Sequence, residues 1–160
     1  TDLDALQQRL GLAFYQPDLL RRALTHRSSL NEKPHLTRDN ERLEFLGDAV
    51  IDFVVTAALF EQFPELDEGD LTRLRSALVR TEQLSQLARS FDLGDALLLG
   101  RGEAESGGRE RDALLCAAFE ALVGALYLDA GVHAVSTFLE PLLLPVARKT
   151  LSSQNQKGWN

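Results

Sequence analysis

Apolar residues recur at intervals of three and four positions along nearly the whole chain. Leu3, Leu6 and Leu10 follow this spacing, and Leu20 and Leu24 continue it further on. No segment shows the strict alternation of apolar and polar residues that is typical of a half-buried strand. The pattern therefore predicts an all-α fold.

Capping residues, glycines and prolines set the expected ends of the helices. We expect a helix over residues 41–62, because Asp39 or Asn40 can cap its start and Pro64 follows its end. A second helix is expected from the capping residue Asp67 to about Ser90. Two more are expected at about 112–129 and 132–149, separated by Gly131.

The remaining segments are expected to connect these helices. Residues 31–39 contain Pro34 among polar side chains and predict a loop. Residues 100–112 contain four glycines and many charges, so they also predict a loop. Residues 151–160 lose the apolar period and are expected to be a polar tail or the start of a linker.

Composition indicates a single folded domain over residues 1–150. With 160 residues, 44% hydrophobic and 26% charged, the chain can fill one core. Its sequence contains no signal peptide and no long uninterrupted apolar run, so we expect no membrane partner. The single Cys116 cannot form an internal disulfide, which agrees with an expected cytoplasmic location. The net charge of −7 argues against non-specific attraction to nucleic acid.

Four acidic residues share one side of the helix expected over residues 41–62. At 100° per residue, Glu41, Glu44, Asp48 and Asp52 fall within about 80° of one another. The rest of this helix is apolar, so its carboxylates need a cation, a donor or water to offset burial. They could alternatively face solvent and simply favour the helix N-terminus. Gly47 destabilises a helix, which predicts a close approach by another helix there.

Glu120 is a second acidic residue in an apolar setting. It is the only charged residue between Leu114 and Leu128. Alone, it could be a structural ion-pair partner. Together with the acids of the earlier helix, it indicates a site with oxygen ligands for Mg²⁺ or Mn²⁺, which serve phosphodiester hydrolysis.

Residues 40–52, NERLEFLGDAVID, closely resemble the signature of the ribonuclease III family. Four further segments resemble that family in the same order: ALTHRS, FPELDEGDLTRLRSALV, SGG and FEALVGALYLDAG. The resemblance covers about residues 2–150. It implies the ribonuclease III endonuclease-domain fold, a homodimer, and cleavage of double-stranded RNA with Mg²⁺, or with Mn²⁺ in its place.

The resemblance also implies roles for individual residues. Glu44, Asp48 and Glu120 would hold the metal, with Asp48 and Glu120 catalytic. Glu41 and Glu68 would lie near the substrate, although Glu41 could face solvent and Glu68 could simply favour a helix N-terminus. Phe45 would insert into a pocket of the partner subunit at the dimer interface, the alternative being a core residue.

One expected ligand is missing. The family would place an Asp three residues before Glu120, where this chain has Ala117. Asp112 cannot fill that place, because it lies two helical turns from Glu120. Ala117 could be an engineered inactivation, a natural variant with altered metal use, or the mark of a non-catalytic relative. The alternative function is therefore an inactive dimeric RNA-binding or ribosome-associated protein.

Arginines are the candidates for contacts with RNA phosphates, the alternative being ordinary surface charge. The candidates are Arg38, Arg73, Arg101, Arg109 and Arg111. The double-stranded-RNA-binding domain typical of the family is not expected within these 160 residues, so RNA binding should be weak and dependent on metal and salt. His26 and Cys116 are expected to be structural, the first hydrogen-bonded and the second in the core.

Overall fold

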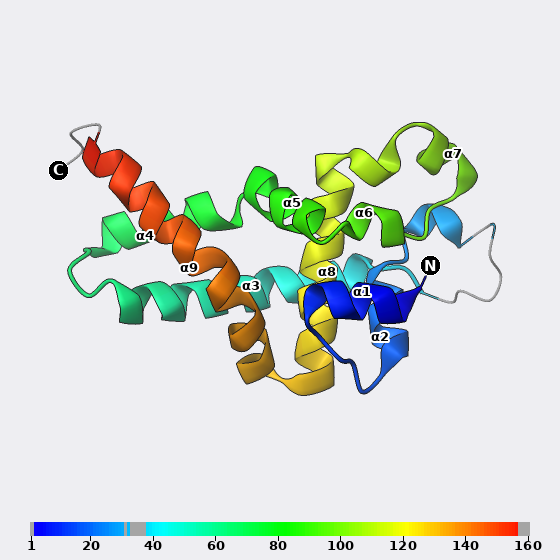
Figure 1. Ribbon diagram of the computed structural model, residues 1–160, viewed down its shortest axis with the longest axis horizontal. Helices are drawn as coiled ribbons and strands as arrows, with labels where there is room; N and C mark the ends of the chain where they lie inside the picture. The colour runs from blue at the N-terminus through cyan, green and yellow to red at the C-terminus, as the bar shows by residue number, and fades with distance from the viewer. Residues whose placement is uncertain (1, 31, 33–37, 157–160) are drawn as a thin grey trace.

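A computed structural model describes residues 2–30, 32 and 38–156 of the chain (Figure 1). Within this part the all-α prediction is confirmed, because the only β-type pairing is an isolated parallel bridge between Thr25 and Leu98. The helices, with η marking 3-10 turns, are α1 Leu3–Leu10, α2 Pro17–Ala23, η1 Arg27–Ser29, α3 Glu41–Gln62, α4 Glu68–Val79, α5 Thr81–Ser90, α6 Leu93–Ala96, α7 Arg101–Glu105, η2 Gly108–Glu110, α8 Asp112–Ala130 and α9 Val132–Gln156.

Helix α8 forms the centre of the core. Most of its residues from Leu115 to Leu126 are buried, and it packs against α2, α3, α5 and α9. Figure 1 shows α8 crossing the long helix α3 steeply. By length and composition alone α8 could span a membrane, but here most of its apolar side chains are covered by the other helices.

Two glycines allow α3 and α8 to touch through their backbones. A Cβ atom at Gly47 would lie 1.7 Å from the carbonyl oxygen of Glu120, and one at Gly124 would lie 2.4 Å from that of Leu43. Neither position can take a side chain without separating the helices. The predicted close approach at Gly47 is confirmed, and it brings Glu120 of α8 beside the acidic residues of α3.

The start of α3 is fixed by two side chains. The Asp39 carboxylate accepts a hydrogen bond from the backbone N–H of Glu41 at 3.1 Å. The buried Asn40 side chain instead donates to the carbonyl of Ala23 at 3.0 Å, which joins the end of α2 to the start of α3. Asp67 caps α4 as predicted, accepting from the N–H of Asp70 at 2.8 Å.

The predicted helix limits were wrong in three segments of the chain. The helix expected from Asp67 to Ser90 is broken at Arg80, whose extended backbone (φ −67°, ψ 158°) separates α4 from α5. The break lets both helices bury apolar residues, such as Leu78 in α4 and Leu84 in α5. Neither residue 80 nor its neighbours are Gly or Pro, so the sequence carried no signal for it.

The other two corrections concern segments expected to lack helix. Residues 100–112 form α7 and η2, held by Arg111, which pairs with Glu103 at 2.8 Å and donates to the Ser106 carbonyl at 3.0 Å. Helix α9 continues beyond residue 150, because Leu151 packs against the core. The predicted loop over residues 31–39 lies largely outside the described residues.

Candidate active site

Helices α3 and α8 together form an open hollow of about 510 Å³. It is lined by Glu41, Glu44, Phe45, Asp48 and Glu120, and we call it the acidic hollow. The crossing at Gly47 produces it, since the backbone contact places Glu120 against the middle of the acidic side of α3. Four of the acids singled out in the sequence thus share one surface.

The carboxylates are close enough to perturb one another. Burial, a hydrogen bond with Asp48 and the negative charges of Asp48 and Glu44 raise the pKa of Glu120 to about 8. Burial also raises the pKa of Glu44, and the charges of Glu41 and Asp48 add to this effect. Without a cation, Glu120 therefore holds a proton near neutral pH, which its hydrogen bond with Asp48 helps to retain.

This donor set suits a hard divalent cation. Mg²⁺ and Mn²⁺ prefer carboxylate oxygens, and a cation would replace the proton that Glu120 holds. Among the described residues, no three acidic, histidine or cysteine side chains are already arranged around one point. Glu44, Asp48 and Glu120 fit a cation in chemistry, and would turn toward it from the walls of the acidic hollow.

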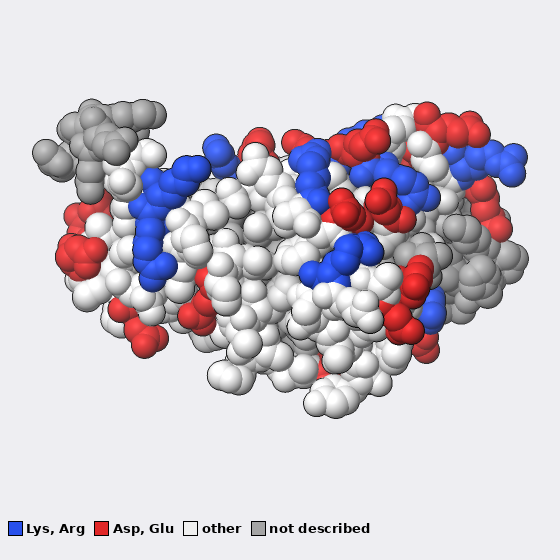
Figure 2. Space-filling view, viewed as in Figure 1, with Lys and Arg blue, Asp and Glu red and all other residues white. Residues whose placement is uncertain are grey.

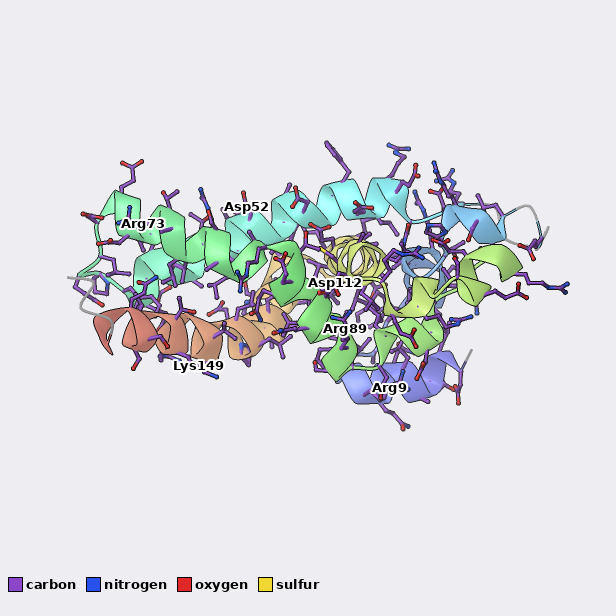
Figure 3. The ribbon with its side chains drawn as sticks, turned by 90° about the horizontal axis from the view of Figure 1, so that it is seen from above. Arg9, Asp52, Arg73, Arg89, Asp112 and Lys149 are labelled. Carbon is purple, nitrogen blue, oxygen red and sulfur yellow. The ribbon has the colours of Figure 1, made fainter. Side chains whose placement is uncertain are left out.

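Ala117 lies one helical turn before Glu120 and is half-buried. Its methyl group offers no ligand. Asp112 does not replace it, because its carboxylate pairs with Arg89, as Figure 3 shows where α5 meets the start of α8. The same arginine donates to the Glu110 carbonyl at 2.9 Å. The acidic hollow therefore contains three of the four acids that the resemblance implies for the metal.

Asp52 lies just beyond the acidic hollow. Its carboxylate is 4.0 Å from Nε of Arg75 in α4, whose guanidinium also donates to the Thr56 hydroxyl at 3.0 Å. Figure 3 labels Asp52 on the outer side of α3. This last acid of the predicted group is thus a surface ion-pair partner.

Glu68 is separated from the other predicted site residues within this chain. It begins α4, after α3 has continued 14 residues beyond Asp48, which is about 21 Å of helix. A role for Glu68 near the substrate stays a prediction.

The predicted phosphate-binding arginines differ in their surroundings. Arg38 and Arg101 are exposed. Arg73 pairs with Asp70 at 2.5 Å, and Arg111 with Glu103. Arg109 donates to the carbonyls of Gly94 and Leu97 at 3.1 and 2.6 Å, so its guanidinium joins η2 to α6. Their contacts with RNA remain predictions, and Arg109 has the least freedom to make one.

An apolar surface lies beside the acidic hollow. Phe45 is 82% exposed, so the alternative that it is a core residue is wrong. Next to it is a second hollow of about 330 Å³, which we call the apolar pocket, lined by Leu46, Ala49, Val50, Phe53, Tyr127 and Val132. Two large apolar side chains of α3, Phe45 and Phe53, are therefore exposed to solvent.

Two structural predictions can be compared directly with the fold. The ring of His26 accepts from the N–H of Ser28 at 3.1 Å and contacts its hydroxyl at 2.7 Å, so the hydrogen-bonded structural role is confirmed. Cys116 is buried as predicted. Its sulfur, however, lies 3.7 Å from Glu120, and burial raises its pKa to about 12. The spacing of four residues from Glu120 could have shown this contact.

A family profile described as Ribonuclease-III-like matches residues 16–146 of the chain. The chain is 52% identical to Ribonuclease 3 of Roseiflexus sp. over 144 residues, covering 88% of this chain and 60% of the relative. It is 54% identical to Ribonuclease 3 of Azotobacter vinelandii over 133 residues, or 83% and 56% of the two chains. The chain thus spans little more than half the length of these curated relatives.

Solved structures show the same fold. The nuclease domain of ribonuclease III from Campylobacter jejuni, described as flexible in a region involved in dimer formation, matches with a TM-score of 0.82 at 42% identity. That match covers 89% of this chain and 96% of the other. Dicer from Pichia stipitis matches with a TM-score of 0.63 at 28% identity, over 90% of this chain and 60% of the other.

Proposed function

The chain belongs to the ribonuclease III family, and we propose that it is the nuclease domain of an endoribonuclease that hydrolyses double-stranded RNA with Mg²⁺. The observation that carries this proposal is the meeting of Glu44, Asp48 and Glu120 in the acidic hollow, where burial raises the pKa of Glu120 and repulsion by the negative charges of Asp48 and Glu44 adds to this effect. Such repulsion is strongest when no cation is bound and favours the binding of one.

The proposed roles follow from the placement of the side chains. A bound divalent cation would supply an activated water and stabilise charge on the leaving oxygen. Glu44, Asp48 and Glu120 would hold it as ligands, and Asp48 and Glu120 lie within hydrogen-bond distance of each other. Glu41, at the edge of the hollow, lies 3.7 Å from Arg27 and shapes the approach of the substrate.

We propose further that the chain acts as a homodimer. The exposed Phe45 of one copy would fill the apolar pocket of the other, removing both apolar groups from water. The description of the Campylobacter jejuni nuclease domain, which mentions a region involved in dimer formation, supports a dimer. A two-fold dimer presents two acidic hollows, one for each strand of a duplex.

Duplex RNA is recognised largely by its shape, phosphates and 2′-hydroxyls, so base-specific side chains are not required. On the face drawn in Figure 2, basic and acidic side chains alternate without forming a continuous basic surface. Together with the net charge of −7, this supports weak and salt-dependent binding of RNA by this part of the protein.

The second candidate function is a dimeric RNA-binding or ribosome-associated protein without nuclease activity. Ala117 is the observation that favours it, because the acidic hollow lacks one anionic oxygen ligand. In that case the fold and dimer are retained while the chemistry is lost.

The two candidates are separated by incubating a labelled duplex RNA with the protein in Mg²⁺, in Mn²⁺ and in EDTA. A nuclease gives metal-dependent cuts, which should be absent in EDTA and with the Glu120→Gln variant. Binding in a gel-shift assay without cleavage in either metal would overturn the proposal and favour the second candidate.

A further inference from the structure

Three arginines gather where the chain enters α3, and we call them the arginine cluster. Arg22 is near the end of α2, Arg38 precedes α3, and Arg42 lies in its first turn. The Nε of Arg22 donates to the carbonyl of Asp39 at 3.3 Å, which holds Arg22 against the segment that carries the other two.

The charges of this cluster act on one another. Burial lowers the pKa of Arg22, and the positive charges of Arg38 and then Arg42 lower it further, while the negative charge of Asp39 opposes them. The guanidinium group of Arg22 therefore lies within electrostatic range of those of Arg38 and Arg42. Such an arrangement is unfavourable unless an anion is present.

The nearby acids offset little of this positive charge. Asp39 uses its Oδ1 to accept from the N–H of Glu41, and the Glu41 carboxylate lies beside Arg27. The ion pairs between described residues include no member of the arginine cluster, and the residues outside the description contain no Asp or Glu. The N-terminus of α3 adds further positive potential. The cluster is thus a local cationic surface on an acidic chain.

The cluster lies beside the acidic hollow. Arg42 follows Glu41, which lines the hollow, and is six residues before Asp48, so it lies about 9 Å from Asp48 along the helix axis and roughly 120° around it. Phosphates of one nucleic-acid strand recur at roughly 3 Å along a duplex axis, so this distance spans a few nucleotides. Guanidinium groups match phosphate oxygens because they donate two parallel hydrogen bonds.

We propose that Arg22, Arg38 and Arg42 bind successive phosphates of the RNA strand whose scissile bond enters the acidic hollow. This inference rests on the proposed function, and it specifies how an acidic domain holds its polyanionic substrate. Because phosphates are the same in every sequence, the cluster fixes the position of the duplex without selecting its bases.

The test measures duplex binding by fluorescence anisotropy in EDTA, which prevents cleavage, for Arg38→Gln, Arg42→Gln and the double variant. Arg22 is left intact because its hydrogen bond supports the fold. The matched control is Arg148→Gln, which removes the same charge from an exposed position of α9. Melting curves verify that each variant is folded.

Each cluster substitution should weaken binding equally for unrelated duplex sequences. The slope of log affinity against log salt, measured between about 50 and 200 mM, should fall by about 1 for each arginine removed. Arg148→Gln should leave the slope unchanged. Arg42→Lys should keep most of the slope, since the charge remains, while losing part of the affinity that the paired donors provide.

The outcomes distinguish this inference from the proposed function. If the double variant and Arg148→Gln bind duplex RNA alike while the parent still cleaves it in Mg²⁺, the arginine cluster is not a phosphate site and the nuclease proposal stands. If the parent neither binds nor cleaves duplex RNA, both proposals are overturned.

Discussion

The acidic hollow and the apolar pocket are neighbours on α3 and α8, but they leave opposite kinds of group unsatisfied. In the first, Glu44, Asp48 and Glu120 repel one another and raise the pKa of Glu120. In the second, Phe53 and Tyr127 surround a cavity with apolar groups that water solvates poorly. Both surfaces lower the stability of an isolated copy. A bound cation would stabilise the acidic hollow, and a second chain would stabilise the apolar pocket.

The comparison indicates that the two surfaces can be disrupted separately. Carboxylates of the acidic hollow should affect chemistry and metal response, while Phe45 should affect assembly. The core beneath them, where Gly47 and Gly124 bring α3 against α8, is common to both. Variants of the two surfaces should therefore keep the same helical content.

The largest expected effect comes from removing a carboxylate of the acidic hollow. Asp48→Asn should reduce Mg²⁺-dependent cleavage of duplex RNA by about 100-fold or more, in the range found for a lost transition-state contact. Its matched control is Asp52→Asn, one turn further along α3, where the carboxylate faces Arg75 outside the hollow. Equal losses in cleavage rate for both variants would show that the acidic hollow has no special role.

Next in size is the loss of the aromatic group at the proposed interface. Phe45→Asp should raise the dimer dissociation constant by about 30-fold, the equivalent of ~2 kcal/mol for a central aromatic anchor. Sedimentation velocity over a concentration series measures this change. Tyr15→Asp is the control, because Tyr15 is 84% exposed but does not line the apolar pocket. A parent that stays monomeric at the highest concentration would contradict the dimer.

The smallest effect concerns stability without metal. Glu120 has its pKa raised from 4.5 to about 8, so the folded state binds a proton that the unfolded state releases. In EDTA, the free energy of unfolding should therefore fall as pH rises from 4.5 to 8. Denaturant titrations at several pH values should show this fall in the parent.

Two variants in the same titrations test whether Glu120 causes this fall in the free energy of unfolding. Glu120→Gln should remove most of the fall, because the amide stays neutral throughout. Glu61→Gln, at an exposed position late in α3, should leave it unchanged. A parent whose stability is constant between these pH values would show that the carboxylates do not repel one another as described.

Much of the fold was predictable because helical periodicity and capping are local. The limits of α3, the cap at Asp67 and the contact at Gly47 all follow from residue type and spacing. The break at Arg80 did not, since it depends on how α4 and α5 reach the core rather than on any Gly or Pro. The continuation of α9 was also missed, because Leu151 is held by tertiary contacts.

In the candidate site, too, local features were predictable from the sequence and tertiary contacts were not. Helical spacing placed Glu41, Glu44 and Asp48 together, and the apolar surroundings of Glu120 in the sequence, together with the resemblance, added it from a distant helix. Spacing could not show that Asp52 would face Arg75, nor that Arg109 would hold two backbone carbonyls. It also could not show that Arg22 would donate to the Asp39 carbonyl, because α2 and the start of α3 are joined by tertiary contacts such as the hydrogen bond of Asn40.

The central claim is that the acidic hollow is a divalent-cation site in which Ala117 occupies the place of a fourth acid. The most direct measurement compares the parent with Ala117→Asp across a Mg²⁺ titration, recording melting temperature and duplex cleavage on the same samples. Ala113→Asp is the matched control, adding the same charge one turn earlier at an exposed position of α8. Ala117→Asp should melt earlier than the parent in EDTA, gain more stability from Mg²⁺, and cleave faster, because its carboxylate adds an oxygen ligand. A melting response and cleavage rate equal to those of Ala113→Asp at every Mg²⁺ concentration would contradict the claim.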